Sequence, residues 1–482
     1  MGWKTISASI VIILIIGISL EVGVFSSIEL QDNDNLENEN NTNLADSAWP
    51  KYRGNNRNTG RSPYDTSHID GGIEWDLPGY GSTRVEPVIG PNGTIYVGYV
   101  DISSSSLTGS RPATLSAINP NGTEMWKFQR GDYIHSTPAV DNQGTIYLGI
   151  NEWVPKKEGS DSYYSIGTFY AVNPNGTEKW NYSVDSSIYD SPSIGEDGTI
   201  YISSGEKLYA FDQDGTVKWN LTFKENLYSS PAIGTDGTIY VGARDTEDDW
   251  EGYLYAINPD GTKEWSYHTE NGGLNSPTIA DDGKIYVTST QGNLYALESD
   301  GTESWKYYTE GTSYSSSIAL GQDGTVHFSS GHLYAVNPDG SEKWIFNISD
   351  DTFSRNQPIV GGDGTIYVGS LGRTVYAIDP EGKKSWDLDL STRYGDGYLT
   401  TAIDDNGTLY IAGYGLHALG EKEQPELNEV LTAFLADNWC FILMFSIFAI
   451  PVIYKIIKSR NSSSSVSRED IFKEDDSKEY KK

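Results

Sequence analysis

Cysteine is nearly absent from this chain, because the 482 residues contain only one, Cys440. A single cysteine excludes an intramolecular disulfide, a CxxC zinc site and a redox site built from neighbouring cysteines. Basic residues are also scarce, with 34 Lys and Arg against 67 Asp and Glu, so the formal net charge is −33. So acidic a chain lacks the basic face that nucleic-acid binding requires, and we exclude nucleic acid as a partner.

Long apolar runs are missing everywhere except at the two ends. The run from Ile6 to Leu20 follows Lys4, so residues 1–27 are predicted to be a signal peptide or a retained signal anchor, with equal weight. Residues 439–457, WCFILMFSIFAIPVIYKII, have about the length of a membrane-spanning helix. We predict a transmembrane helix there; a buried core helix is the alternative.

Charges near this second run predict its orientation. Lys455 and Lys458 place residues 458–482 in the cytoplasm as a disordered tail, by the positive-inside rule. The rest of the chain up to the span is then extracytoplasmic, and we predict a cell-membrane location with a single C-terminal span. The acidic, Asn-rich residues 28–46 are predicted to be a linker, and residues 421–438 a juxtamembrane segment.

Glycine and aromatic residues, by contrast, are abundant and periodic. A GTIY-like motif occurs eight times, at 93–96, 144–147, 198–201, 237–240, 283–286, 324–327, 364–367 and 407–410. An LYA-like motif also occurs eight times, at 115–117, 169–171, 208–210, 254–256, 294–296, 333–335, 375–377 and 416–418. A tryptophan follows the second motif in seven repeats, at Trp126, Trp180, Trp219, Trp265, Trp305, Trp344 and Trp386, and an eighth, Trp75, precedes the first repeat.

These repeats predict an all-β fold. Each repeat alternates apolar and polar residues over short runs bounded by Asp-Gly or Asn-Gly turns, as in antiparallel hairpins. The period matches a four-stranded propeller blade, with strands A to D counted outward from the axis. We therefore predict an eight-bladed β-propeller over residues 47–420, in which the N-terminal strand bearing Trp75 closes the last blade.

The unit between strands C and D carries a family resemblance. AINPDGTKEW at 256–265 resembles the tryptophan-docking repeat of the PQQ-like propeller family, although it is one residue shorter than the family pattern. WPKYRGNNRNTGRSP at 49–63 is similar to the segment that precedes such propellers. The resemblance implies that the eight tryptophans listed above are structural and pack each blade against its neighbour.

The resembling family has two kinds of member. Quinoprotein dehydrogenases use PQQ, calcium, a catalytic Asp and usually a vicinal disulfide, whereas non-enzymatic members resemble the propeller lipoprotein of the outer-membrane β-barrel assembly machinery. The propeller here contains no cysteine, so that disulfide is impossible. This departure favours the scaffold members.

The two faces of the predicted ring differ in sequence. The turn face, made of the A–B and C–D turns, is nearly uniform. The loop face, made of the B–C loops and the D-to-A connections, varies, with long B–C loops at 99–114, 150–167 and 243–252. Varied residues just before strand A are expected at the channel end on this face, and we take as ligand-binding candidates Arg84, His135, Tyr189, Asp190, Tyr228, Asn275, Arg355, Asn356 and Tyr398.

These observations support a non-catalytic module that binds or scaffolds a protein or glycan partner, with no cofactor, metal ligand or catalytic residue. The alternative is a quinoprotein-like oxidoreductase with PQQ and calcium at the channel end, where Asp190, Asn275 and Arg355 are the candidates. A sensor acting through the short tail is a third possibility. The alternative for these nine candidates is that they bind no ligand and only line a water-filled channel as solvated polar groups.

Two further patterns concern the surface. Asp-Gly turns are explained by hairpin chemistry and contain no calcium-binding loop. Sequons of the form N-x-S/T occur at Asn40, Asn92, Asn121, Asn175, Asn181, Asn220, Asn347 and Asn406, so an exported domain is open to glycosylation.

Overall fold

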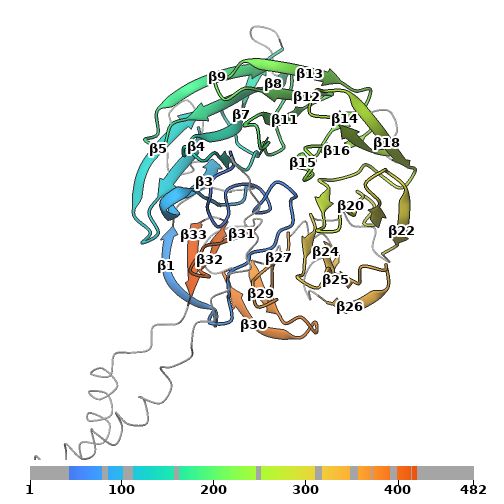
Figure 1. The fold of residues 1–482 in the computed structure, drawn as a ribbon. Coiled ribbons are helices and arrows are strands. Elements are labelled where there is room, and N and C mark those ends of the chain that lie inside the picture. Colours follow the sequence, from blue (N-terminus) through green and yellow to red (C-terminus); the bar gives the residue numbers. More distant parts are fainter. Residues whose placement is uncertain are drawn as a thin grey trace, which may run out of the picture. The chain divides into compact units, whose positions relative to one another are not determined.

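The computed structural model describes residues 43–78, 85–100, 112–156, 162–245, 251–309, 317–347, 357–370, 373–390, 399–413 and 415–420. The chain divides into two compact units, Met1–Glu421 and Lys422–Lys482, and all described residues belong to the first. The described residues form eight antiparallel sheets. The sheets follow one another around a central axis (Figure 1), which confirms the predicted eight-bladed propeller.

The first four blades follow the chain in order. Blade 1 contains β2 (Val88–Ile89), β3 (Ile95–Val100), β4 (Ala113–Ile118) and β5 (Glu124–Arg130), with the short 3₁₀ turn η1 (Pro91–Gly93) after β2. Blade 2 contains β6 (Ala139–Val140), β7 (Ile146–Pro155), β8 (Tyr163–Val172) and β9 (Glu178–Val184). Blade 3 contains β10 (Ser193–Ile194), β11 (Ile200–Ser204), β12 (Lys207–Phe211) and β13 (Val217–Thr222). Blade 4 contains β14 (Asn226–Leu227), β15 (Ala232–Ile233), β16 (Ile239–Arg244), β17 (Gly252–Ile257) and β18 (Lys263–Thr269).

The last four blades repeat the pattern. Blade 5 contains β19 (Thr278–Ile279), β20 (Ile285–Thr288), β21 (Leu294–Leu297) and β22 (Glu303–Tyr307). Blade 6 contains β23 (Ala319–Leu320), β24 (Val326–Ser330), β25 (His332–Val336) and β26 (Glu342–Phe346). Blade 7 contains β27 (Ile359–Val360), β28 (Ile366–Gly369), β29 (Thr374–Ile378) and β30 (Lys384–Asp389). Blade 8 contains β31 (Thr400–Ile403), β32 (Leu409–Ala412), β33 (Gly415–Gly420) and β1 (Gly72–Pro78).

The turn between strands C and D shows why each hairpin folds as the sequence predicts. In blade 4, the Asp260 carboxylate accepts a hydrogen bond from the Thr262 backbone N–H at 2.9 Å. Gly261 follows with a φ of +86°, a left-handed conformation that glycine adopts without strain. Asp and Gly therefore fold this turn by local chemistry.

The outer-strand tryptophans join neighbouring blades. Trp219 donates its indole N–H to the Pro259 carbonyl of the next blade at 2.9 Å. Its ring lies 5.8 Å from the ring of Tyr201 and covers Gly261, where a Cβ atom would come within 2.8 Å of the indole. The carbonyls that accept such a bond belong, in blade order from Trp75 to Trp386, to Pro120, Pro174, Gln213, Pro259, Ser299, Pro338, Pro380 and Ile69.

The ring closes through the N-terminal strand. β1 pairs with β33 from Gly72 opposite Gly420 to Pro78 opposite Gly415, so blade 8 takes its outer strand from the start of the propeller. Trp386 of blade 7 docks on the Ile69 carbonyl, at 2.8 Å, in place of a C–D turn. The closure predicted from the position of Trp75 is therefore confirmed.

The segments predicted to meet the membrane lie at the two ends of the chain. The predicted signal segment, the transmembrane helix at 439–457 and the tail lie outside the described residues. Within the described ranges, no helix is long and apolar enough to cross a membrane. Asn43, the first described residue, already contacts the propeller, because its carbonyl accepts a hydrogen bond from the Asn142 N–H at 3.0 Å. Leu44 and Ala45 follow and are buried against blade 2.

Candidate functional site

A belt of hydrogen bonds aligns the residues that precede strand A in successive blades. The Thr137 hydroxyl accepts from the Glu86 backbone N–H at 3.0 Å, and Thr137 N–H donates to the Ser191 hydroxyl at 3.0 Å. Ser191 N–H donates to Ser230 at 2.9 Å, and Ser230 N–H donates to Ser276 at 2.9 Å. Equivalent residues of blades 1 to 5 are therefore neighbours around the axis.

This belt brings five of the predicted candidates together. His135, Tyr189, Asp190, Tyr228 and Asn275 each lie one or two positions before a belt residue, in the connections that enter blades 2, 3, 4 and 5. Tyr189 and Tyr228 are each 42% exposed. The connections into blades 2 to 5 thus bring together five of the side chains that were selected by comparing the repeats.

Four other candidates cannot be placed. Arg84, Arg355, Asn356 and Tyr398 lie outside the described residues. Their role stays a prediction.

Four aromatic rings gather beside the belt, and we call them the aromatic cluster: Tyr133, His135, Trp153 and Tyr189. The Tyr133 ring lies 5.1 Å from His135 and 5.2 Å from Trp153, and His135 stacks on Tyr189 at 5.5 Å. The Tyr133 hydroxyl lies 3.4 Å from that of Tyr189. Trp153 is 51% exposed, so the cluster presents aromatic surface to solvent.

Trp153 stands on strand where a loop was predicted. Residues 150–167 were predicted as a long B–C loop, but β7 and β8 extend into this stretch and pair from Asn151 opposite Gly167 to Pro155 opposite Tyr163. Valine, tryptophan and tyrosine favour strands, and this preference extends the hairpin beyond the blade. Trp153 was missed as a site residue, although its position in the longest variable loop was a usable signal.

The next two blades add a cation and an amide. The Arg244 guanidinium lies over the Tyr228 ring, 4.6 Å from its centroid. Asn275 donates from its side-chain amide to the Thr288 hydroxyl at 3.0 Å. Arg244, a second residue that the sequence did not single out, gives this side of the loop face a positive group on an aromatic platform.

Asp190 is the acid of this surface. Burial raises the pKa of its carboxyl to about 7, and a hydrogen bond from the Ser229 backbone partly opposes that shift. A carboxyl with such a pKa changes charge close to neutral pH.

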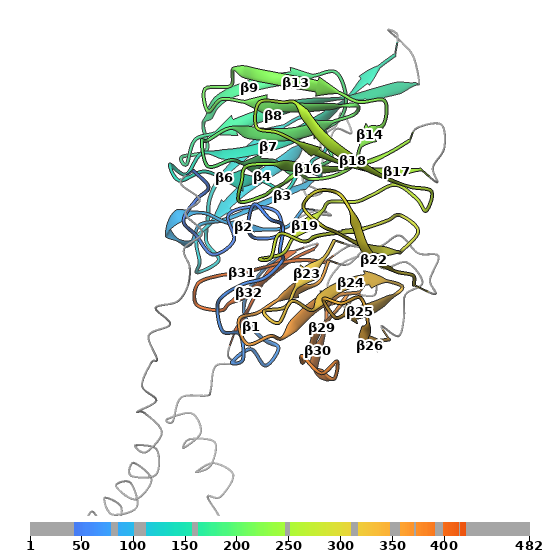
Figure 2. The same cartoon turned by 45° about the vertical axis from the view of Figure 1, so that its right-hand side comes forward.

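The opposite end of the channel is filled by the chain itself. The leading segment, residues 43–71, crosses the turn face, on the other side of the ring from the tip of the β7–β8 hairpin (Figure 2). Its carbonyls accept hydrogen bonds from the backbone N–H groups that end strand A in six blades, those of Ile89, Val140, Ile233, Ile279, Leu320 and Val360. The segment is therefore an integral part of the propeller.

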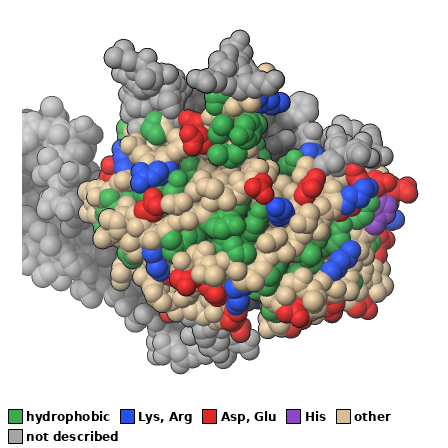
Figure 3. Space-filling view, turned by 90° about the horizontal axis from the view of Figure 1, so that it is seen from above, with side chains coloured by type: hydrophobic (Ala, Val, Ile, Leu, Met, Phe, Trp, Pro, Cys, Tyr) green, Lys and Arg blue, Asp and Glu red, His purple; other side chains and the backbone are tan. Residues whose placement is uncertain are grey.

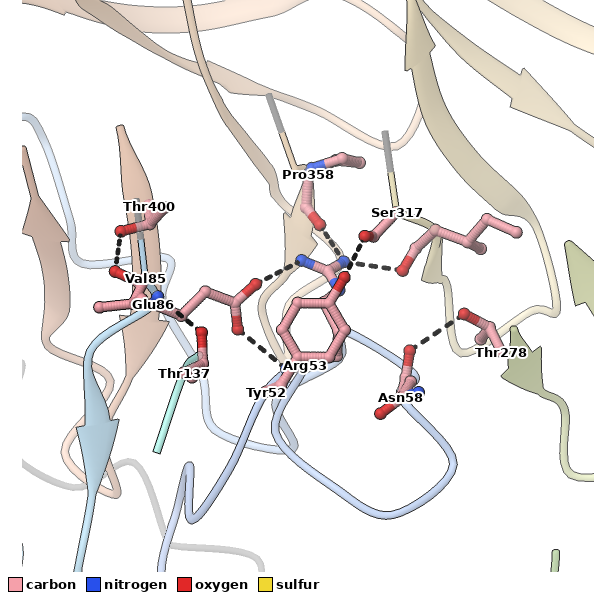
Figure 4. A network of polar contacts seen from close by, with 11 residues as sticks. Tyr52, Arg53, Asn58, Val85, Glu86, Thr137, Thr278, Ser317, Pro358 and Thr400 are labelled. Atoms are coloured by element: carbon pink, nitrogen blue, oxygen red, sulfur yellow. Dashed lines mark hydrogen bonds and ion pairs between the residues drawn. The ribbon is translucent and has the colours of Figure 1, made fainter. Parts of the chain in front are cut away.

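Arg53 is the centre of this plug (Figure 4). Its side chain is wholly buried and donates to the carbonyls of Ile318, at 2.7 Å, and Pro358. It also pairs with the buried Glu86 carboxylate at 3.4 Å. Arginine satisfies all three acceptors because its planar guanidinium carries several donors.

Lys51 is buried beside Arg53, donating to the Asn58 side-chain oxygen at 2.7 Å. Burial lowers the pKa of its amine to about 7, although the Glu86 charge raises it. These buried groups fill the channel at its turn-face end. The run at 49–63 was interpreted from sequence only as the segment that precedes such propellers, and its buried role follows from tertiary contacts.

The calcium and quinone site considered from sequence is only partly described, because Arg355 lies outside the described residues. In the described ranges, no three His, Cys, Asp or Glu side chains come together as a metal site. Arg53 is committed to Glu86 and two carbonyls, and Asn275 to Thr288. We therefore derive no step through PQQ or calcium.

Comparisons with known proteins support the fold assignment. The family model described as outer membrane protein assembly factor BamB matches residues 111–228 and 221–370, which together exceed half of the chain. No match was found among curated proteins.

Solved structures share the architecture at low identity. Quinohemoprotein alcohol dehydrogenase from Comamonas testosteroni is 14% identical, with a TM-score of 0.60 over 78% of this chain and 81% of its own. A europium-containing methanol dehydrogenase is 13% identical, with a TM-score of 0.59 over 76% of this chain and 89% of its own. BamB from Moraxella catarrhalis is 18% identical, with a TM-score of 0.48 over 71% of this chain and 99% of its own. At these identities the likenesses show the fold alone. The chain belongs to the PQQ-like β-propeller family that is represented by the outer membrane protein assembly factor BamB.

Proposed function

We propose that the protein is a membrane-anchored, extracytoplasmic propeller that binds or scaffolds a protein or glycan partner through its loop face. The observation that carries this proposal is the aromatic cluster, with Trp153 and Tyr189 about half exposed beside the belt. Exposed Trp, Tyr and Arg are the side chains that most often dominate binding energy at interfaces. Arg244 over Tyr228 extends the same chemistry to the next blade.

The leading segment occupies the turn face, and this supports the loop face as the binding surface. The leading segment covers the inner ends of the blades there, so the turn face is already occupied by the chain itself. The sequon asparagines of the described residues are exposed and lie in turns or at outer strands, at Asn92, Asn121, Asn175, Asn181, Asn220, Asn347 and Asn406. Glycans at these positions would leave the aromatic cluster uncovered.

The cellular location rests on the two ends of the chain. An apolar run near each terminus and the basic residues after the second one place the propeller outside the cytoplasm. The matched family is described as an assembly factor, and this description supports a protein partner for the module.

Site-specific photocrosslinking in the native cell tests the binding role. A crosslinking amino acid replaces Tyr189 on the loop face or, as the matched control, Tyr182 on outer strand β9, which is 36% exposed. Figure 3 shows that hydrophobic side chains also form bands on the outer rim, so the control tests whether exposed aromatic surface alone is sufficient. We expect a discrete crosslinked product at Tyr189 that is absent at Tyr182.

Equal labelling at both positions, or none at Tyr189, would contradict the proposal. The oxidoreductase alternative has its own test, because PQQ with calcium should raise the melting temperature if it binds the folded state. A shift together with dye-linked alcohol or sugar oxidation would replace the scaffold assignment with an enzymatic one.

A further inference from the structure

The β7–β8 hairpin carries a strand edge that no described residue covers. β9 pairs with β8 only as far as Val184 opposite Gly167, and β7 continues to pair with β8 out to Tyr163. Tyr163 to Ile166 therefore have β7 on one side and, within the ranges that the structure describes, no strand on the other. An edge of this kind presents unpaired backbone donors and acceptors.

The register shows which groups point outward. Lys156 N–H donates to the Ser162 carbonyl at 2.8 Å, so residues that alternate from this pair bond within the hairpin. The intervening residues of β8 point away from β7. Gly167 follows this rule, since its N–H donates to the Ser186 carbonyl at 3.0 Å. Ser165 and Tyr163, two and four residues further out, present their N–H and C=O groups on the same side.

Side chains flank this edge on both faces. Ser165 lies opposite Trp153 in the register, and its hydroxyl contacts the Tyr133 hydroxyl at 2.5 Å, so this face joins the aromatic cluster. Tyr163 and Tyr164, which alternate in direction, are 53% and 46% exposed. A strand placed along the edge would bury aromatic surface on each face.

We propose that the outer edge of β8 at Tyr163–Ile166 receives an extended segment of a partner protein as an added strand. This inference rests on the binding role proposed for the loop face and specifies how a protein partner is held. Main-chain hydrogen bonds to Tyr163 and Ser165 supply the pairing, and apolar side chains of the segment pack on Trp153 and the tyrosines.

The net charge of the protein indicates that the partner segment is basic. With 67 acidic residues against 34 basic ones, the protein attracts a basic segment and repels an acidic one. The same net charge of −33 opposes pairing between the edges of two copies. A glycan cannot use the strand edge, because it lacks the regular alternation of backbone donors and acceptors.

A proline substitution tests this inference sharply. Ser165→Pro removes the outward N–H of β8 while leaving the bonds to β7, because Ser165 and Trp153 form a pair without mutual backbone bonds. Ser165→Ala is the matched control, since it keeps the N–H and removes only the hydroxyl. The probe is a blocked octapeptide in which Lys alternates with Val and Thr, titrated against the full-length chain in mild detergent.

We expect the peptide to bind the wild type and Ser165→Ala equally and Ser165→Pro about tenfold more weakly. A peptide with Glu in place of Lys, and one N-methylated at alternate positions, should not bind. An unchanged urea midpoint for Ser165→Pro shows that the propeller remains folded.

Several outcomes would overturn the added strand. They are equal affinity for Ser165→Pro, equal binding of the N-methylated peptide, or no peptide binding at all. Oligosaccharide binding lost in Trp153→Ala but kept in Ser165→Pro would assign the surface to a glycan. Concentration-dependent dimerisation abolished by Ser165→Pro would assign the edge to a second copy. If Tyr189 crosslinks persist in Ser165→Pro cells, the binding role survives without this mode.

Discussion

At the scale of single residues, tryptophan links each blade to the next. Each indole combines a hydrogen bond to a neighbouring carbonyl with packing on a tyrosine or histidine ring and on a glycine. Histidine replaces the tyrosine in blade 6, where His327 lies 5.5 Å from Trp344. Burial lowers the pKa of His327 to about 3, so the ring is neutral and packs as an aromatic group.

Removing one such link should destabilise the whole ring. We expect Trp219→Ala to lower the free energy of unfolding by about 2–4 kcal/mol, through lost packing and an unpaired Pro259 carbonyl. Trp153→Ala is the matched control, because Trp153 is 51% exposed and should cost about 1 kcal/mol or less. Urea unfolding measures both, and equal losses would contradict the docking role of Trp219.

Asp190 predicts a pH dependence with a definite sign. Its ordinary pKa of 3.8, which we assign to the unfolded chain, rises to about 7 in the folded state. The folded chain thus binds the Asp190 proton more tightly than the unfolded chain. The contribution of this proton to the free energy of unfolding is lost as the pH rises from about 4 to about 7. Compared with Asp190→Asn, the wild type should lose urea resistance as the pH rises from about 4 to about 7. A difference that is constant with pH would contradict this shift.

At the scale of elements, the leading segment fills the turn-face end of the channel. Its turns bring Gly60 against Arg53, with a φ of +60° and a Cβ position only 2.0 Å from the Arg53 guanidinium. The segment therefore depends on glycine at this point for two reasons, conformation and close approach. The buried arginine leaves no room for a side chain there.

A pair of glycine substitutions separates these two reasons. Gly283 has a φ of +85° and nothing within 4 Å of a built Cβ, so Gly283→Ala should cost only the backbone strain, about 1 kcal/mol. Gly60→Ala should cost about 3 kcal/mol or more, because it also displaces Arg53 and leaves the buried Glu86 poorly paired. Similar urea midpoints for the two variants would show that the plug contributes little stability.

At the scale of the whole molecule, the ring is closed by residues far apart in sequence. β1 seals blade 8, and Trp386 docks on Ile69 ahead of that strand. Closure packs blade 8 against blade 1 through Trp75 and the Pro120 carbonyl, so it covers two blade faces that an open array of the same repeats would expose.

Membrane topology is the prediction that belongs to this scale. With the propeller outside and residues 458–482 inside, proteinase K added to intact cells should digest the propeller and leave a C-terminal epitope protected. Permeabilised cells provide the control, in which the epitope must disappear. Loss of the epitope in intact cells would reverse the proposed orientation.

Prediction from sequence succeeded where the physics is local and repeated. Alternation along strands, Asp-Gly turns and the offset of Trp75 determine the eight blades and their closure, because each repeat specifies the same hairpins. The comparison of the repeats also selected His135 and Tyr189, which lie together in the structure. It did not select Trp153 or Arg244, because both lie in stretches predicted as B–C loops and outside the positions that were compared before strand A.

The amino-acid sequence alone thus determined the fold, its closure and the variable face, because the same local strand and turn preferences are repeated eight times. Only the tertiary structure decided what fills the channel and which edge stays open. Arg53 is buried because Glu86, Ile318 and Pro358, far away in sequence, supply its partners. Likewise, the edge at Ser165 has no partner strand among the described residues because β9 ends at Val184, and the length of a strand depends on the neighbours with which it pairs.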